Sequence, residues 1–129
     1  MREIKFRFWN EAGKHYHYDQ MTAMECLKQQ SLGMYDHEKE GCAFEQYTGL
    51  KDINGKEIYD GDILDHEGVR FDAAWDDVLS AWMCWPIQAE GPRHLFEMNK
   101  ASRIVGNIHE NRDLLGHITI EAKIEMRHG

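Results

Sequence analysis

Two histidines in a strand-like segment are the first residues of this sequence that could do chemistry. His15 and His17 alternate with Tyr16 and Tyr18, so on a β-strand both imidazoles lie on one face. Imidazole is a common ligand of zinc and other transition metals, which makes this pair the candidate metal ligands of the chain. A metal site needs a third ligand, and none of the remaining histidines is a specific candidate for it. We therefore expect two exposed strand histidines, no bound metal and no other cofactor.

Carboxylates cluster near the middle of the chain. The cluster contains Asp52, Glu57, Asp60, Asp62 and Asp65. Paired carboxylates can transfer protons or bind a hard cation, although the ligand spacing of an EF-hand is absent. An aspartate beside a glycine, such as Asp62 after Gly61, more often closes a turn by accepting hydrogen bonds from nearby backbone N–H groups. We favour that structural interpretation and predict no catalytic residue.

No side chain stands out as a nucleophile. Cys84 lies in Trp82-Met83-Cys84-Trp85, and the flanking indoles indicate burial, whereas a reactive thiolate needs an accessible, electropositive setting. Ser80 lacks a G-x-S-x-G context. Cys26, Cys42 and Cys84 form neither a zinc knuckle nor a C-x-x-C pair.

Four aromatic side chains could form a stacking platform for single-stranded nucleic acid: Tyr59, Trp75, Trp82 and Trp85. Such platforms lie among Lys and Arg, but Trp75 stands among three aspartates. Core packing therefore explains most of these side chains better. Trp82 faces the opposite way from Trp85, so we expect at least one tryptophan at the surface.

Residues 46–64 form the run that must position most of these groups. Asn54-Gly55 is the strongest short-range hairpin signal, and a type I′ turn there needs positive φ at both residues. Apolar residues and glycines alternate on either side of it. We predict a strand, a tight hairpin at Asn54-Gly55, and another strand that begins near Asp62.

Period-two alternation predicts strands over most of the remaining chain. They cover residues 3–9, 15–18, 43–48, 62–66, 69–75, 78–85, 94–98, 103–109 and 117–126. Between Asp19 and Gly33 the period changes, and Thr22 with Glu25 fits a capping box at the start of a helix. Residues 110–115 have the pattern of one helical turn. The fold class is therefore mostly β, in a single domain.

Composition bounds the function. The 129 residues carry a formal net charge of -8, which disfavours sequence-independent binding of duplex nucleic acid. A local basic face near Arg2, Lys5, Arg7 and Lys14 would favour such binding. Charged residues follow Met1 at once, and the apolar runs are too short to cross a bilayer. We therefore expect a cytoplasmic protein with reduced thiols and no membrane partner.

Three sequence blocks, taken together, resemble the YopX family of phage and prophage proteins. The blocks are residues 2–9, residues 46–63, and Val105-Gly106-Asn107-Ile108-His109-Glu110-Asn111 with Leu114-Leu115. The residues that carry the structural motif are Tyr47, Gly49, Leu50, Asp52, Asn54, Gly55, Ile58, Tyr59, Gly61, Asp62, Ile63, Gly106 and Asn107. The resemblance covers residues 1–115 and implies a small barrel-like or pseudo-barrel β domain with short capping helices. It brings no established activity and no catalytic residues, and residues 116–129 have no counterpart in it.

These observations favour a non-enzymatic phage or prophage accessory protein that binds a protein partner, copies of itself included. The alternatives are a nucleic-acid-associated β-barrel module and, third, a metal-dependent hydrolase that uses His15 and His17. The C-terminal extension alternates strictly from Ile118 to Arg127, which predicts a strand whose apolar face pairs outside the family core. Another copy of the chain is its expected partner, so we expect a homo-oligomer; the alternative is that the strand folds back onto the sheet of its own chain.

Overall fold

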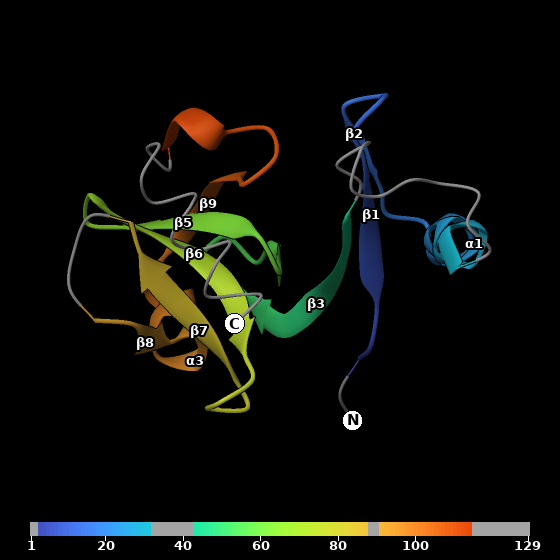
Figure 1. The fold of residues 1–129 in the computed structure, drawn as a ribbon. Coiled ribbons are helices and arrows are strands. Elements are labelled where there is room, and N and C mark those ends of the chain that lie inside the picture. Colours follow the sequence, from blue (N-terminus) through green and yellow to red (C-terminus); the bar gives the residue numbers. More distant parts are fainter. Residues whose placement is uncertain (1–2, 32–42, 88–90, 115–129) are drawn as a thin grey trace. The chain divides into compact units, whose positions relative to one another are not determined.

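The structure, a computed structural model, describes residues 3–31, 43–87 and 91–114 (Figure 1). The chain is mostly β with short helices, and its largest sheet curls into a half-barrel, which confirms the fold class expected from the sequence. The chain forms two compact units, residues 1–49 and residues 50–129. The predicted C-terminal strand lies outside the described residues.

The first unit is built around strand β1 (Phe6–Asn10). Strand β2 (His15–His17) pairs with it on one side and strand β3 (Ala43–Lys51) on the other, both antiparallel. Burial of Phe8 and Trp9, on opposite faces of β1, accounts for the aromatic alternation of this segment. Strand β3 continues into the second unit, where β4 (Glu57–Tyr59) is its neighbour in the sheet.

Helix α1 (Gln20–Ser31) begins one turn earlier than the predicted capping box. Asp19 is the capping residue: its carboxylate accepts hydrogen bonds from the Thr22 hydroxyl at 2.8 Å and the Thr22 amide at 3.1 Å. These bonds lower the pKa of the Asp19 carboxyl below its ordinary value. The prediction of Thr22 as the cap was therefore wrong, because α1 begins at Gln20 and Asp19 caps the Thr22 amide, which places Thr22 inside the first turn. Within the described residues no helix combines the length and apolar character needed to cross a bilayer.

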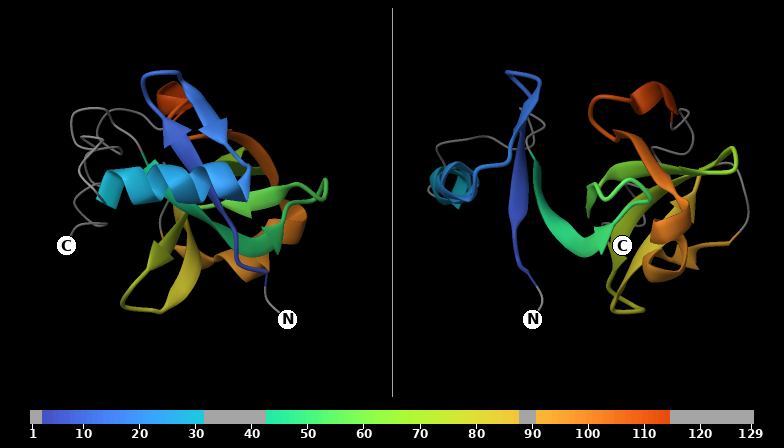
Figure 2. Two further views of the ribbon diagram at one scale, coloured as in Figure 1. Left: turned by 90° about the vertical axis from the view of Figure 1, so that its right-hand side faces the viewer. Right: turned by 180° about the vertical axis from the view of Figure 1, so that it is seen from behind.

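The second unit contains a five-stranded antiparallel sheet in the order β8-β7-β6-β5-β9 (Figure 2). The strands are β5 (Asp62–His66), β6 (Val69–Asp76), β7 (Ala81–Pro86), β8 (Arg93–His94) and β9 (Arg103–Asn107). Three short helices complete it: α3 (Leu95–Met98), η1 (Asn99–Ala101) and η2 (Arg112–Leu114). Strand β5 therefore pairs with β6, its neighbour along the chain, and also with β9, which follows the short helices.

Two strand predictions in this unit were wrong in their boundaries. Residues 94–98 form the end of β8 and then α3, because a helical turn places Leu95 and Met98 on one face and buries both. Strand β7 begins at residue 81 rather than 78. The carboxylate of Asp76 accepts hydrogen bonds from the amides of Val78 and Leu79, at 2.8 and 3.0 Å, and thereby closes a turn.

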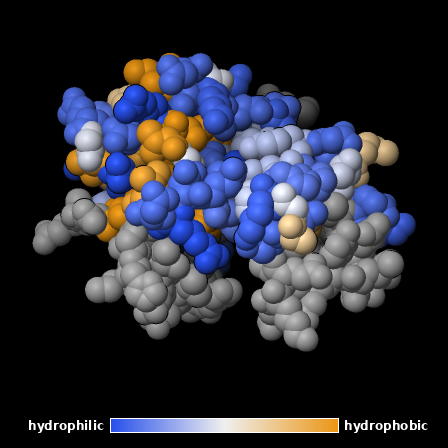
Figure 3. Space-filling model, turned by 90° about the horizontal axis from the view of Figure 1, so that it is seen from above, coloured by the Kyte–Doolittle hydropathy of each residue, from blue (hydrophilic) through white to orange (hydrophobic). Residues whose placement is uncertain are grey.

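Two apolar clusters form the core of the second unit. The first contains Ile58, Leu64, Phe71, Ala73, Cys84, Leu95 and Met98. Each large side chain in it gains about 1.5–3 kcal/mol on burial. The second contains Ile63 and Ile87, against which the partly buried Val105, Ile108 and Leu114 pack. Figure 3 views the side on which η2 lies, and hydrophobic side chains gather there among hydrophilic ones.

The hairpin between β3 and β4 differs in detail from the predicted type I′ turn. Gly55 has a φ of 79°, but Asn54 is not among the described residues with positive φ. The loop is longer than two residues, since the Asp52 amide donates to the Lys56 carbonyl at 2.9 Å. The Asp52 carboxylate holds the loop amides, so only one residue needs the left-handed conformation.

We expect Gly55→Val to lower the free energy of unfolding by about 1–3 kcal/mol, because a β-branched residue is strained at positive φ. Asn54→Val is the matched control, since it places the same side chain one residue earlier without that strain. Urea denaturation of both variants measures the difference. If Gly55→Val and Asn54→Val lower the free energy of unfolding equally, both residues need positive φ, and the turn is type I′ after all.

Candidate functional site

The carboxylate of Asp52 is buried where three backbone N–H groups converge. Its Oδ1 accepts hydrogen bonds from the amides of Asn54 and Lys56, at 2.9 and 2.8 Å, and its Oδ2 from the amide of Ile104 at 2.9 Å. Ile104 lies on β9, which is 52 residues further along the chain. A buried carboxylate that accepts this many bonds is stabilised as a structural anion. Asp52 therefore joins the β3–β4 hairpin to β9.

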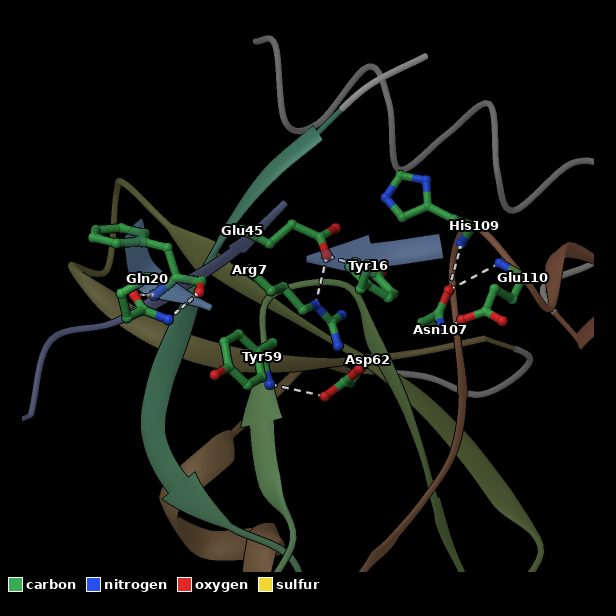
Figure 4. Close-up of polar contacts among 10 residues, drawn as sticks. Arg7, Tyr16, Gln20, Glu45, Tyr59, Asp62, Asn107, His109 and Glu110 are labelled. Carbon is green, nitrogen blue, oxygen red and sulfur yellow. Dashed lines mark hydrogen bonds and ion pairs between the residues drawn. The ribbon is translucent and has the colours of Figure 1, made fainter. Parts of the chain in front are cut away.

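Other members of the acidic cluster also bind backbone amides. Figure 4 shows Asp62 accepting a hydrogen bond from the Tyr59 amide at 2.8 Å, and Asp62 is buried. Asp65 accepts one from the Gly68 amide at 3.2 Å in the β5–β6 turn. These contacts agree with the structural interpretation of the cluster. They leave the aspartates as closures of turns rather than as a pair facing a common ligand.

The loop after β9 is organised by Asn107 (Figure 4). Its Oδ1 accepts hydrogen bonds from the amides of His109 and Glu110, at 3.0 and 2.9 Å, and its Nδ2 donates to the Glu110 carboxylate at 3.0 Å. The Asn107 amide in turn donates to the Asn111 side chain at 3.1 Å. A Cβ at Gly106 would clash with that Asn111 side chain, so glycine is required there. Gly106 and Asn107 are thus explained by the geometry of this loop.

A buried ion pair lies in the first unit (Figure 4). The Arg7 guanidinium donates to the Glu45 carboxylate at 2.9 Å and lies 4.0 Å from the centre of the Tyr16 ring, whose hydroxyl donates to Glu45 at 3.0 Å. Arg7 and Glu45 are both buried. Such a network holds strands β1, β2 and β3 together and strongly disfavours the loss of one partner.

Gln20 ties helix α1 to the edge of the same sheet (Figure 4). Its side-chain amide accepts a hydrogen bond from the Phe6 amide at 2.8 Å and donates to the Phe6 carbonyl at 2.7 Å. The side chain thereby pairs with β1 just beyond the last residue of β2. It covers backbone groups that an edge strand would otherwise expose.

The candidate metal ligands His15 and His17 lie next to each other on β2, with ring centroids 4.6 Å apart. The Nδ1 of His15 contacts the Gly13 carbonyl at 3.1 Å. In the part of the chain that the structure describes, no three His, Cys, Asp or Glu side chains are placed to hold one metal ion. The pair is therefore brought together without a third ligand from the described segments.

The remaining candidates for chemistry have structural positions. Cys84 is fully buried in the first apolar cluster of the second unit. Ser80 has a φ of 50° in the β6–β7 turn. Burial disfavours the thiolate form of a cysteine, and neither residue has the setting of an activated nucleophile.

The aromatic candidates do not form one platform. Tyr59 is buried, and Trp82 packs against the first apolar cluster. Trp75 is the exposed tryptophan, at 42% of its surface, and its ring meets Trp82 edge-on with centroids 5.4 Å apart. The expected surface tryptophan is therefore Trp75, which lies near the end of β6.

Trp75, Val78 and Leu79 form an exposed apolar group at the end of the β6–β7 hairpin, named here the apolar tip. Val78 is 92% exposed and Leu79 52%. The tip is held in shape, because Asp76 binds the amides of Val78 and Leu79 and the Asp77 carboxylate accepts the Trp75 indole N–H at 2.8 Å. Sequence reasoning assigned residues 78–85 to a strand and so missed this tip. The aspartate pair before Val78 did predict a tight connection, but not that the turn extends through Leu79.

The rest of the predicted motif supports the core and the hairpin. Ile58 and Ile63 are fully buried, Tyr47 is buried in β3, and Leu50 packs against the first cluster. Gly61 links two strands, since its amide donates to the Ala73 carbonyl and its carbonyl accepts from the Ile108 amide, at 2.8 and 2.9 Å. The sequence placed most of these residues in one run, residues 46–64. It did not show that Asp52 connects them to β9.

We expect Asp52→Ala to lower the free energy of unfolding by about 3 kcal/mol or more, because hydrogen bonds to a charged group contribute about 1.5–3 kcal/mol each. Asp65→Ala is the matched control and should cost about 1 kcal/mol, since it removes one bond at a half-exposed turn. Urea denaturation measures both. A loss for Asp52→Ala no larger than for Asp65→Ala would refute the role of this carboxylate.

Comparison with solved structures finds a similar fold in the crystal structure of protein EF1440 from Enterococcus faecalis. The alignment covers 90% of this chain and 100% of that chain, with a TM-score of 0.58 and 21% sequence identity. At that identity the likeness concerns the fold alone. No curated protein matches the sequence.

Comparison with protein families gives a match over most of the chain. The family described as YopX protein matches residues 5–116. That range contains residues 46–63, residues 105–115 and most of residues 2–9, the sequence blocks on which the resemblance rested. This chain belongs to the YopX family.

Proposed function

We propose that this chain is a non-enzymatic phage or prophage accessory protein that acts in the bacterial cytoplasm by binding protein, copies of itself included. The apolar tip carries the proposal. Three large apolar side chains stand at the end of one hairpin, where Asp76 accepts hydrogen bonds from the amides of Val78 and Leu79 and Asp77 accepts one from the Trp75 indole N–H. Exposed apolar groups on a rigid support are typical of protein-binding surfaces, since little conformational entropy is lost on docking.

The nucleic-acid alternative has less support, because the basic residues expected to bind nucleic acid are mostly paired with carboxylates. Of the basic residues named for that face, Arg7 is buried against Glu45, Lys5 lies 3.2 Å from Glu3, and Lys14 pairs with Glu11. Paired lysines and arginines release fewer counterions on binding a polyanion. The metal-dependent alternative rests on His15 and His17, for which the described residues supply no third ligand.

The C-terminal extension supports self-association from its sequence. Ile118, Ile120, Ile124 and Met126 would share one face of a strand. Burial of each side chain gains about 1.5–3 kcal/mol, so exposure of all four is costly. The extension also follows Leu114, a member of the partly covered second cluster. Exchange of this segment between two copies would bury the face and satisfy its backbone together.

Deletion of residues 117–129 should reduce the mass of the assembly, because the exchanged segment is removed. Multi-angle light scattering of the full-length and shortened chains over a range of concentrations measures this. A full-length chain that stays monomeric at high concentration would refute self-association. An oligomer whose number of chains is unchanged by the deletion would refute exchange of the extension and leave self-association standing through another surface.

Duplex DNA should not bind appreciably at physiological salt, because the formal charge of -8 opposes a polyanion. An electrophoretic mobility shift at about 150 mM salt, close to physiological ionic strength, tests this. A shift at micromolar protein or below would favour the nucleic-acid alternative instead.

A further inference from the structure

We propose that the apolar tip of one copy docks on a basic surface of a second copy, so that copies associate head to tail. The inference rests on the proposed function, in that it names the partner and the contact surface for self-association. It depends on two surfaces of the second unit that differ in charge and lie apart from each other.

The receiving surface consists of four exposed basic residues, named here the cationic patch: Lys51, Lys56, Lys100 and Arg103. They come from two segments that are far apart in sequence. The Ile53 amide donates to the Ser102 carbonyl at 2.9 Å, and the Asn99 side-chain amide donates to the Lys51 carbonyl at 2.7 Å. These bonds fix the β3–β4 hairpin beside η1 and the start of β9, and so place the four residues around one region.

The cationic patch has an apolar centre and unneutralised charge. Ile53 is 61% exposed and lies between the two basic segments. Among the described residues, no carboxylate forms an ion pair with any of the four basic side chains. A surface of this kind fits a ligand that is both apolar and acidic.

The apolar tip has that complementary chemistry. Asp76 and Asp77 directly precede Val78, the most exposed apolar residue of the tip. Their carboxylates accept hydrogen bonds from backbone and indole N–H groups of the tip itself. Val78 can therefore pack against Ile53 of the partner copy while the aspartates face its lysines and arginine.

The two surfaces occupy different sides of the second unit. In the left view of Figure 2, the end of the β6–β7 hairpin (yellow) points to the lower left, whereas the β3–β4 hairpin (green) lies at the right. A copy cannot bring its own tip to its own patch without unfolding the sheet. A second copy can supply the tip, and each copy then still offers one free surface, which is the geometry of a ring or a filament.

Local charge outweighs net charge at such a contact. The formal charge of -8 on each copy opposes association, but screening limits that repulsion to about 8 Å at physiological ionic strength. The same aspartates disfavour docking of the tip on an anionic membrane, because they would face lipid phosphates. A second copy is the occupant that both surfaces fit.

Two full-length variants test the contact. The first disables the tip with Val78→Ser and Asp77→Lys, and the second disables the patch with Lys100→Glu and Arg103→Glu; all four positions are exposed. The variant without a working patch keeps its tip, and the variant without a working tip keeps its patch. A mixture of the two therefore retains one intact tip and one intact patch, and fluorescence anisotropy of the labelled patch variant, titrated with the tip variant, measures their binding. Circular dichroism establishes that each variant is folded.

The mixed pair should bind, and each variant should bind itself at least about tenfold more weakly, which corresponds to about 1.4 kcal/mol. Binding of the mixed pair should also weaken as salt is raised. A control with Glu67→Lys and Val69→Ser, which makes the same kinds of change at the neighbouring β5–β6 turn, should associate like the wild-type chain.

Equal association in all combinations would overturn the contact and leave self-association to another surface. Failure of the wild-type chain to associate at any concentration would overturn both this contact and self-association. A further outcome is that the wild-type chain sediments with phosphatidylglycerol vesicles without associating with itself. If Val78→Ser abolished that sedimentation, the contact between copies would be overturned in favour of a membrane surface.

Discussion

The second unit depends most on the burial of one carboxylate, that of Asp52. A buried charge is costly unless hydrogen bonds replace water, and here amides from the hairpin and from β9 do so. The hairpin and the last strand must therefore be in place together. The Ile53–Ser102 and Asn99–Lys51 bonds strengthen the same junction. The positions of the basic residues on these segments follow from this constraint.

The polar side chains that suggested chemistry serve mainly to organise the backbone. Asp62, Asp65 and Asp76 bind amides in turns, and Asn107 binds the amides of the loop after β9. Each removes the cost of an unpaired buried or turn N–H group. What the described part of this unit presents to solvent is instead a contrast in charge and polarity, between the apolar tip and the cationic patch. Such a contrast suits recognition of a surface.

The fold itself does not assign a function. A small curled sheet with short helices supports many unrelated activities, and the family resemblance brings no catalytic residues. Protein binding is supported instead by exposed apolar side chains: Val78 and Trp75 at a rigid hairpin end, and Ile53 among basic residues. They are properties of this chain.

The class of fold and most of the strands could be predicted from the sequence. Alternation in residues 62–66 and 69–75 predicted β5 and β6 closely, because a strand with one buried face leaves a period-two pattern. The grouping of residues 46–64 was also readable, since glycine and aspartate mark turns locally. Local sequence patterns failed to predict the structure where it depends on contacts with residues far away in the sequence.

The role of each aspartate and the positions of the exposed groups depend on contacts between distant parts of the chain. Asp52 looked like one acidic residue among five, and its role depends on Ile104, whose position relative to the hairpin no local pattern encodes. Residues 95–98 are helical because Leu95 and Met98 must both face the core. The cationic patch arose in the same way, from two segments that approach only after β9 pairs with β5. Contacts between residues far apart in sequence are set by packing and hydrogen bonding of the whole sheet, and this is why the chain alone did not reveal them.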